Sequence, residues 1–161
     1  MRKVGILKKI SDVYKTLDEI VSVVEGRKIV FTNGCFDVIH EGHIRLFEFA
    51  KSLGDCLVVG INSDSSVRAL KGDSRPINNQ EQRASIVASI RFVDYCFIFD
   101  DYTPIPSIKK LRPSIHVKGG DYKLEELPET EVIRQYGGEI VIFPFYKDFS
   151  TTSILDKIKR L

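Results

Sequence analysis

The chain has 161 residues, of which 43% are hydrophobic and 29% are charged, so it is long enough to bury the core of one domain and has the composition of a soluble globular protein. Its formal net charge of +2 is too small to predict nucleic-acid binding, and an anionic small molecule would bind only where positive residues converge. Three cysteines without a C-x-x-C spacing argue against a disulfide framework and against a structural zinc site.

The first part of the chain has a helical pattern. Residues 11–27, SDVYKTLDEIVSVVEGR, favour one amphipathic helix. The N-terminal stretch MRKVGILKKISD lacks an apolar core long enough for a signal peptide, and no apolar run approaches membrane-spanning length. We therefore expect a cytoplasmic protein without a membrane segment, with a helical lead-in over 1–27 and a single globular domain over 28–161.

From residue 28 onward, short β-branched runs alternate with segments of helical period. The expected strands are 28–33, 56–62, 94–99, 114–119 and 139–145. The expected helices are about 43–53, 64–70, 80–91, 104–111, 129–136 and 152–160. Asn79 and Gln82 form a plausible capping pair for one helix, and Gly137-Gly138 ends another. This alternation predicts an α/β fold with a doubly wound, mostly parallel, five-stranded sheet.

Ligands of doubly wound sheets bind beyond the carboxyl ends of the strands, where the strand order reverses. The loops that follow the strands are therefore the informative ones. Four of them are polar and rich in glycine or hydroxyl side chains: TNGCFDVIHEGH (32–43), NSDSSVRALKGDSRP (62–76), KGGDY (118–122) and YKDFSTT (146–152). We expect them to form a site at one rim of the sheet.

The first loop places two imidazoles at a helix start. His40 and His43 lie on one face of the opening turn, and Gly42 between them removes a side chain that would block a ligand. Unpaired backbone N–H groups and the positive end of the helix dipole point the same way. The loop, with Gly34 and Asp37 nearby, predicts an anion site suited to a phosphate chain.

Two other interpretations of this loop stay open. In the first, the histidines only cap the helix, a task that serine or threonine performs as well. Alternatively they would bind a metal, with Cys35, Asp37 or His116 completing the coordination sphere. H-x-x-H lacks the spacing and the glutamate of the zinc hydrolase motif.

Two later loops carry further candidates. Lys118 brings a charge, Gly119-Gly120 allows close approach to backbone, and Asp121 could accept from a ribose hydroxyl, although the same residues make a plain turn. The four hydroxyl residues 150–153 open the last helix and would either cap it or present a second helix terminus to the same phosphates.

The remaining cations complete the candidate set. A solvated surface position is the default for each of them. Arg91 lies between apolar residues directly before a strand, which favours a specific role. The expected acceptor-binding residues are Lys71, Arg83 and Arg91. Neither the P-loop sequence nor G-x-G-x-x-G occurs, which disfavours a P-loop kinase and a dinucleotide-binding protein.

Together these motifs resemble a known family. GCFDVIHEGH followed by STTSI resembles the cytidylyltransferase-like branch of the H-x-G-H nucleotidyltransferases. Within that branch, VFTNGCFDVIHEGHI, LVVGINSDSSVRALKG and VKGGDY are similar to the D-glycero-β-D-manno-heptose 1-phosphate adenylyltransferases, from about residue 28 to the end. The lead-in resembles the segment that precedes this domain in bifunctional proteins. We expect that no sugar-kinase domain precedes it here and that the chain is a stand-alone transferase.

The resemblance implies roles for the matching residues. His40, His43 and Lys118 would be catalytic, holding the ATP phosphates and stabilising the transition state. Asp37 would lie near Mg²⁺, which the phosphates would mainly hold. The implied nucleotide-binding residues are Thr32, Asn33, Gly34, Phe36, Asp37, Gly42, Lys71, Gly119, Asp121, Ser150, Thr151 and Thr152. Arg91 matches a phosphate-binding arginine of the glycerol-phosphate cytidylyltransferases, whereas Phe145 occupies the place of another arginine of that group.

The implied reaction transfers AMP from ATP to heptose 1-phosphate, giving ADP-heptose and pyrophosphate for lipopolysaccharide or surface heptose. The acceptor phosphate is already anionic near neutral pH, so no strong general base is needed. We expect a homodimer that binds these small molecules and neither nucleic acid nor membrane. The alternatives are the same chemistry on glycerol 3-phosphate or phosphoethanolamine with CTP or on FMN with ATP, a non-catalytic nucleotide-binding module, and a metal-dependent hydrolase.

Overall fold

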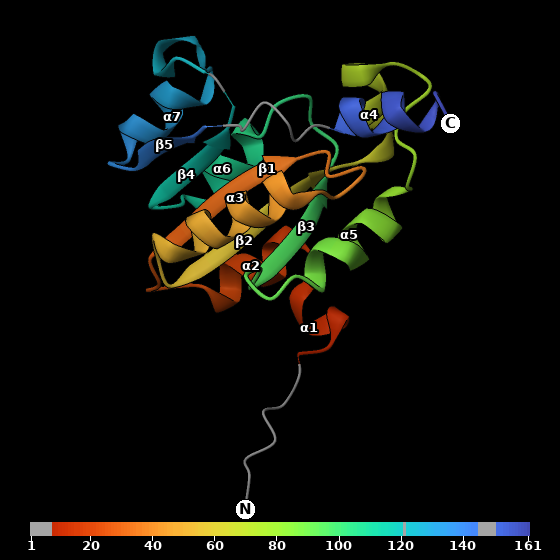
Figure 1. The fold of residues 1–161 in the computed structure, drawn as a ribbon. Helices are drawn as coiled ribbons and strands as arrows, with labels where there is room; N and C mark the ends of the chain where they lie inside the picture. The colour runs from red at the N-terminus through yellow and green to blue at the C-terminus, as the bar shows by residue number, and fades with distance from the viewer. Residues whose placement is uncertain (1–7, 121, 145–150) are drawn as a thin grey trace, which may run out of the picture.

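The computed structural model describes residues 8–120, 122–144 and 151–161 (Figure 1). Within these ranges, five parallel strands form one sheet in the order β3-β2-β1-β4-β5. The strands are β1 (Ile29–Gly34), β2 (Cys56–Asn62), β3 (Tyr95–Phe99), β4 (Ile115–Gly119) and β5 (Glu139–Phe143). Each begins within a residue of its predicted position, and β5 ends two residues early. The predicted fold class is confirmed.

The strand order reverses next to β1. The chain moves from β1 to β2 and β3 on one side, then returns to place β4 and β5 on the other side. The crevice at the carboxyl ends of β1 and β4 is therefore the expected ligand position.

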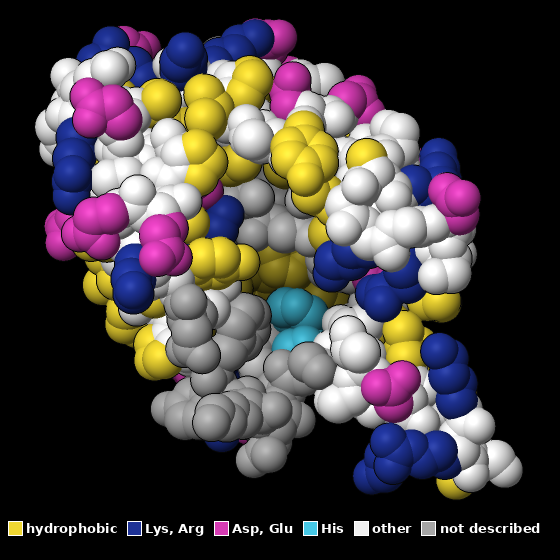
Figure 2. All heavy atoms as spheres, turned by 90° about the horizontal axis from the view of Figure 1, so that it is seen from above, with side chains coloured by type: hydrophobic (Ala, Val, Ile, Leu, Met, Phe, Trp, Pro, Cys, Tyr) yellow, Lys and Arg dark blue, Asp and Glu magenta, His cyan; other side chains and the backbone are white. Residues whose placement is uncertain are grey.

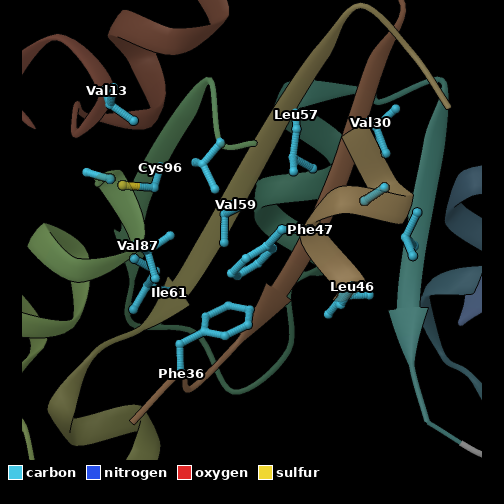
Figure 3. Packing of buried hydrophobic residues seen from close by; sticks show 14 of the residues in the cluster. Val13, Val30, Phe36, Leu46, Phe47, Leu57, Val59, Ile61, Val87 and Cys96 are labelled. Atoms are coloured by element: carbon cyan, nitrogen blue, oxygen red, sulfur yellow. The ribbon is translucent and has the colours of Figure 1, made fainter. Parts of the chain in front are cut away.

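Helices cover both faces of the sheet (Figure 1). On one face, α3 (Glu41–Ser52) and α5 (Gln80–Ala88) pack Phe47 and Val87 against residues such as Val59, as Figure 3 shows. On the other face, α2 (Leu17–Val23), α6 (Ile105–Leu111) and α7 (Glu129–Gln135) pack against Phe31 and its neighbours. Because successive strand residues point to opposite faces, one buried sheet supplies two hydrophobic cores.

The lead-in differs from the prediction of a single helix over 11–27. It forms α1 (Ile10–Val13) and α2, and the chain between them runs along the sheet edge. Tyr14 pairs with Cys96 of β3, and the Lys15 N–H donates to the Cys96 carbonyl at 3.0 Å. The backbone groups of an edge strand need partners, and this demand outweighs the helical period. Val13 and Ile20 then enter the cores on opposite faces of the sheet, so the lead-in wraps the β3 edge.

The remaining helices follow their predicted positions, with shifts at the ends. Asn79 and Gln82 cap α5 reciprocally, as predicted, and α5 ends at Ala88 rather than 91. Gly137, with φ 81°, follows the end of α7 as predicted. The other two helices are α4 (Asp64–Lys71) and α8 (Thr151–Ile158), and a short 3-10 helix over Leu124–Glu126 was not predicted. Among the described residues, no helix combines the length and hydropathy needed to cross a bilayer.

Candidate active site

A pocket of about 360 Å³ opens at the carboxyl edge of the sheet, around the reversal of strand order. Figure 2 looks onto this edge and shows a hollow with a histidine side chain at its floor. The described residues that line the pocket are Asn33, Gly34, Cys35, Phe36, Asp37, His43, Leu46, Asn62, Leu70, Lys71, Tyr102, Pro104, Lys118, Gly119, Tyr122 and Thr151. The pocket thus lies at the edge of the sheet where the sequence predicts a site.

The two histidines stack at the N-terminus of α3. His40 is the N-cap residue, and its ring lies 3.8 Å from the His43 ring, centroid to centroid, with 26° between the planes. The His40 backbone N–H donates to Nδ1 of His43 at 3.3 Å. A neutral imidazole that accepts at Nδ1 carries its proton on Nε2, so His43 caps the helix and keeps one donor for a ligand. The capping interpretation and the anion-site interpretation are thus compatible.

Both imidazoles are neutral near pH 7. Burial, with smaller contributions from the neighbouring His40 and Lys71, lowers the pKa of His43 to about 3. Burial also lowers the pKa of His40. His40 does not line the pocket itself, and its Nδ1 is buried without a hydrogen-bond partner among the described residues. His43 therefore offers the pocket an N–H donor rather than positive charge.

Phe36 packs against His43 of the histidine pair. Its backbone has φ 47°, a left-handed conformation that is uncommon for an aromatic residue, and this turns the chain directly after β1. The ring meets His43 edge-on at 5.4 Å and also packs on Phe47 at 5.1 Å. A Cβ atom at Gly34 would lie 3.1 Å from the Phe36 ring, so glycine allows this packing. Phe36 is thus placed to orient His43.

Asp37 lines the pocket, but its carboxylate already accepts hydrogen bonds from another loop. Arg75 Nε donates to it at 2.6 Å, and the N–H groups of Ile77 and Asn78 donate at 2.8 and 2.9 Å. Burial works to raise the pKa of Asp37, but these bonds outweigh it and hold that pKa below its ordinary value. Asp37 therefore ties the first loop to the segment after α4.

The described residues provide no ready-made metal centre. No group of three or more His, Cys, Asp or Glu side chains is arranged to hold a metal ion within the described ranges. Asp37 is the one carboxylate among the described residues that line the pocket, and its oxygens are engaged as above. These residues therefore do not fit a protein-ligated Mg²⁺, and such an ion would depend on substrate phosphates.

Two lysines reach the pocket from different elements. Lys71, exposed at the end of α4, lines one side. Lys118, at the end of β4, lines another and donates to Glu129 at 2.8 Å. Its Nζ also lies 5.7 Å from the centre of the Tyr122 ring. Together with the α3 N-terminus, these cations surround the space where a phosphate chain would lie.

The two arginines expected at the acceptor do not line the pocket. Arg83 is fully buried and donates to the carbonyls of Asn78 and Cys35 and to the Asp64 carboxylate, so it braces the loops behind the site. Arg91 is exposed with its guanidinium over the Phe92 ring, and it precedes β3 at the amino end of the sheet. The structure therefore brings neither of them to the crevice.

The predicted small and hydroxyl residues divide into three groups. Asn33, Gly119 and Thr151 line the pocket, and Thr151 donates to the Val38 carbonyl at 3.2 Å. The buried Asn33 Oδ1 has no hydrogen-bond partner among the described residues, which leaves it for a ligand. Three others lie close by without lining it: buried Thr32, buried Gly42 and exposed Thr152. Asp121 and Ser150 lie outside the described residues.

Sequence reasoning missed several lining residues. Tyr102 and Tyr122 are 68% and 47% exposed at the pocket, and Asn62 ends β2 beside β1. Asn62 opens the loop 62–76 that was expected at the site because it follows a strand, but it was not singled out as a binding residue. Tyr122 belongs to the loop 118–122 that was expected at the site but was not singled out, and Tyr102 follows no motif. Glu129 was also missed, because a glutamate in the first turn of a helix already has an ordinary explanation in the helix dipole.

Known proteins resemble this chain over most of its length. A family model described as cytidylyltransferase-like matches residues 31–157. The chain is 47% identical over 151 residues to a Geobacter metallireducens protein named Bifunctional protein HldE, and 49% identical over 145 residues to a protein of the same name from Campylobacter fetus. These matches cover 91% and 89% of this chain, and the chain spans 31% of the length of each relative.

Solved structures share the fold. The crystal structure of a lipopolysaccharide core biosynthesis protein from Thermoplasma volcanium matches with a TM-score of 0.61 and 27% identity, over 76% of this chain and 98% of that one. Pantothenate synthetase from Thermus thermophilus matches with a TM-score of 0.67 over 92% of this chain and 70% of that one. At 13% identity, the second likeness concerns the fold alone.

Proposed function

This chain belongs to the cytidylyltransferase-like family, and on that premise we propose that it transfers AMP from ATP to D-glycero-β-D-manno-heptose 1-phosphate and releases pyrophosphate. The observation that carries the proposal is the pair of stacked, neutral imidazoles at the N-terminus of α3, of which His43 lines a pocket that Lys71 and Lys118 also line. The curated relatives named Bifunctional protein HldE and the lipopolysaccharide core biosynthesis protein support the choice of a heptose acceptor.

The reaction needs charge stabilisation more than proton transfer. The nucleophile is a phosphate oxygen whose second pKa is about 6, so it is already anionic near neutral pH. Negative charge develops around the α-phosphorus in the transition state, where fixed hydrogen-bond donors are most effective. A neutral His43 that donates from Nε2 suits this task, since its pKa of about 3 makes it a poor general base at pH 7.

The protein must also hold two mutually repelling anions in line. The α3 N-terminus, Lys71 and Lys118 would hold the phosphates of ATP and of the acceptor together in the pocket that they line. Thr151 at the start of α8 would add a hydroxyl. Mg²⁺ would neutralise the phosphates when bound, held by their oxygens. Homodimerisation and a cytoplasmic location are further parts of the proposal.

A pyrophosphate-release matrix tests the function. Each of the four ribonucleoside triphosphates is combined with heptose 1-phosphate, glycerol 3-phosphate, phosphoethanolamine and FMN. We expect release above background with ATP and heptose 1-phosphate. Preferred turnover of CTP with glycerol 3-phosphate would replace the proposed substrates. ATP binding without release for any acceptor would identify a nucleotide-binding module instead.

A further inference from the structure

A buried carboxylate stands behind the pocket lysine. Glu129, the first residue of α7, is 1% exposed, and its Oε1 accepts a hydrogen bond from Lys118 Nζ at 2.8 Å. We propose that Glu129 is a positioning residue that fixes the Lys118 ammonium in the pocket wall for the reacting phosphates. This inference rests on the proposed function.

The placement follows from strand periodicity. His116 and Lys118 are two residues apart on β4, so both side chains point to the face of the sheet that α7 covers. Lys118 is the one nearer the carboxyl end of the strand, and its side chain is 18% exposed at the pocket. Glu129 reaches across from α7 and lies between the two, with Oε1 at 4.0 Å from His116 Nε2.

The cluster is a single ion pair beside a neutral ring. Burial works to raise the pKa of Glu129, but the hydrogen bond and charge of Lys118 outweigh it and lower that pKa. Burial, reinforced by Lys118, lowers the pKa of His116 to about 3 against the pull of Glu129. His116 is therefore uncharged and does not compete with Lys118 for the carboxylate. It fills the space beneath the ion pair at 0% exposure.

This pairing has a consequence for the ligand. A lysine side chain has four rotatable bonds and loses much conformational freedom when an anion fixes it. An ammonium has three N–H donors, so a bond to Glu129 holds the group in one place and still leaves donors for phosphate. The Lys118 side chain therefore loses this conformational entropy when the protein folds and does not lose it again each time the ligand binds.

A double-mutant cycle separates positioning from simple stabilisation of α7. The variants are Glu129→Gln, Lys118→Met and the double variant, with exposed Glu131→Gln on the same helix as the matched control. Pyrophosphate release with ATP and heptose 1-phosphate gives kcat and KM for each, and thermal unfolding gives Tm. We expect kcat to fall about 10-fold for Glu129→Gln and about 100-fold for Lys118→Met, by analogy with lost oxyanion donors. The double variant should match Lys118→Met, and Glu131→Gln should match wild type.

The unfolding data provide a second readout. Lys118→Met leaves a buried carboxylate without its partner, so its Tm should be lower than that of the double variant. The proposal is overturned if Glu129→Gln lowers kcat by the same factor in both backgrounds, or lowers Tm while kcat stays at the wild-type value.

The cycle also distinguishes this inference from the proposed function. If the wild-type protein releases no pyrophosphate with any acceptor, the proposed function fails, and the same variants are compared by calorimetric ATP binding. Non-additive losses of ATP affinity would still support positioning of Lys118 by Glu129. Additive losses, or no ATP binding by the wild-type protein, would overturn the inference as well.

Discussion

At the scale of single residues, polar groups of the first loop serve the fold and the pocket together. His43 accepts a backbone N–H at Nδ1, which fixes its orientation and leaves Nε2 for a ligand. The Asp37 carboxylate accepts hydrogen bonds from Arg75 and from the backbone N–H groups of Ile77 and Asn78. The loop is therefore held in place before any nucleotide arrives, which is the preorganisation that electrostatic catalysis requires.

Removing the His43 imidazole should abolish most turnover while the fold persists. We expect His43→Ala to lower kcat by about 10²–10³-fold, because a donor directed at the transition state is lost. Pyrophosphate release measures this effect, and circular dichroism with thermal unfolding checks the fold. Glu48→Ala, on the exposed side of the same helix, is the matched control and should retain wild-type kcat. Wild-type turnover by His43→Ala would exclude a role for His43 in the transition state.

At the scale of elements, the lead-in shows how an edge strand competes with helix formation. The chain leaves helical geometry at Tyr14, pairs with β3 and begins a new helix after Thr16. Thr16 Oγ1 accepts a hydrogen bond from the Glu19 N–H at 3.3 Å, and Glu19 Oε2 accepts one from the Thr16 N–H at 2.7 Å. This capping box is what restarts the helix, and α2 then delivers Ile20 to the second core.

Loss of this cap should be measurable as stability. Thr16→Ala should lower the free energy of unfolding by about 1 kcal/mol, because the first turn of α2 loses its side-chain acceptor. Urea denaturation followed by circular dichroism measures the difference. Exposed Ser22→Ala, within the same helix, serves as the control and should cost little, since alanine is the better helix former. Equal losses in the two variants would mean that the cap contributes nothing specific.

At the scale of the whole molecule, the sheet buries one core on each face, and the pocket opens at its carboxyl edge. Two of its histidines are held in surroundings that disfavour charge: burial lowers the pKa of both His43 and His116 to about 3. In the unfolded chain their pKa returns to about 6.5. Between these values the unfolded state binds more protons than the folded state.

The free energy of unfolding should therefore fall as the pH is lowered from about 6.5 towards 3, beginning above the range in which carboxylates titrate. Urea denaturation at pH 7.0 and at pH 5.0 should show a loss of stability at pH 5.0. His116→Leu removes a buried ring whose nitrogens have no hydrogen-bond partner among the described residues. That variant should lose less stability between the two pH values. An unchanged pH dependence in His116→Leu would show that His116 does not contribute to it.

Much of the fold and part of the site were predictable from local pattern. The β-branched runs placed each strand start within a residue, and the H-x-G-H loop after the first strand pointed to the edge of the sheet where the pocket opens. The reciprocal Asn79–Gln82 cap was predicted as well. Such features follow from side-chain periodicity and from hydrogen bonds between near neighbours in the chain, and both can be recognised from the sequence alone.

Other features depend on residues far apart in sequence, and only the tertiary structure decided them. It divided the lead-in at the β3 edge, joined Asp37 to Arg75 and Lys118 to Glu129, and left Arg83 and Arg91 out of the pocket. By itself, the sequence determined the order of elements and the imidazole pair at a helix start. Which charge meets which is set by strand order and helix packing, because a buried ion forms its pair only where folding brings a partner within reach.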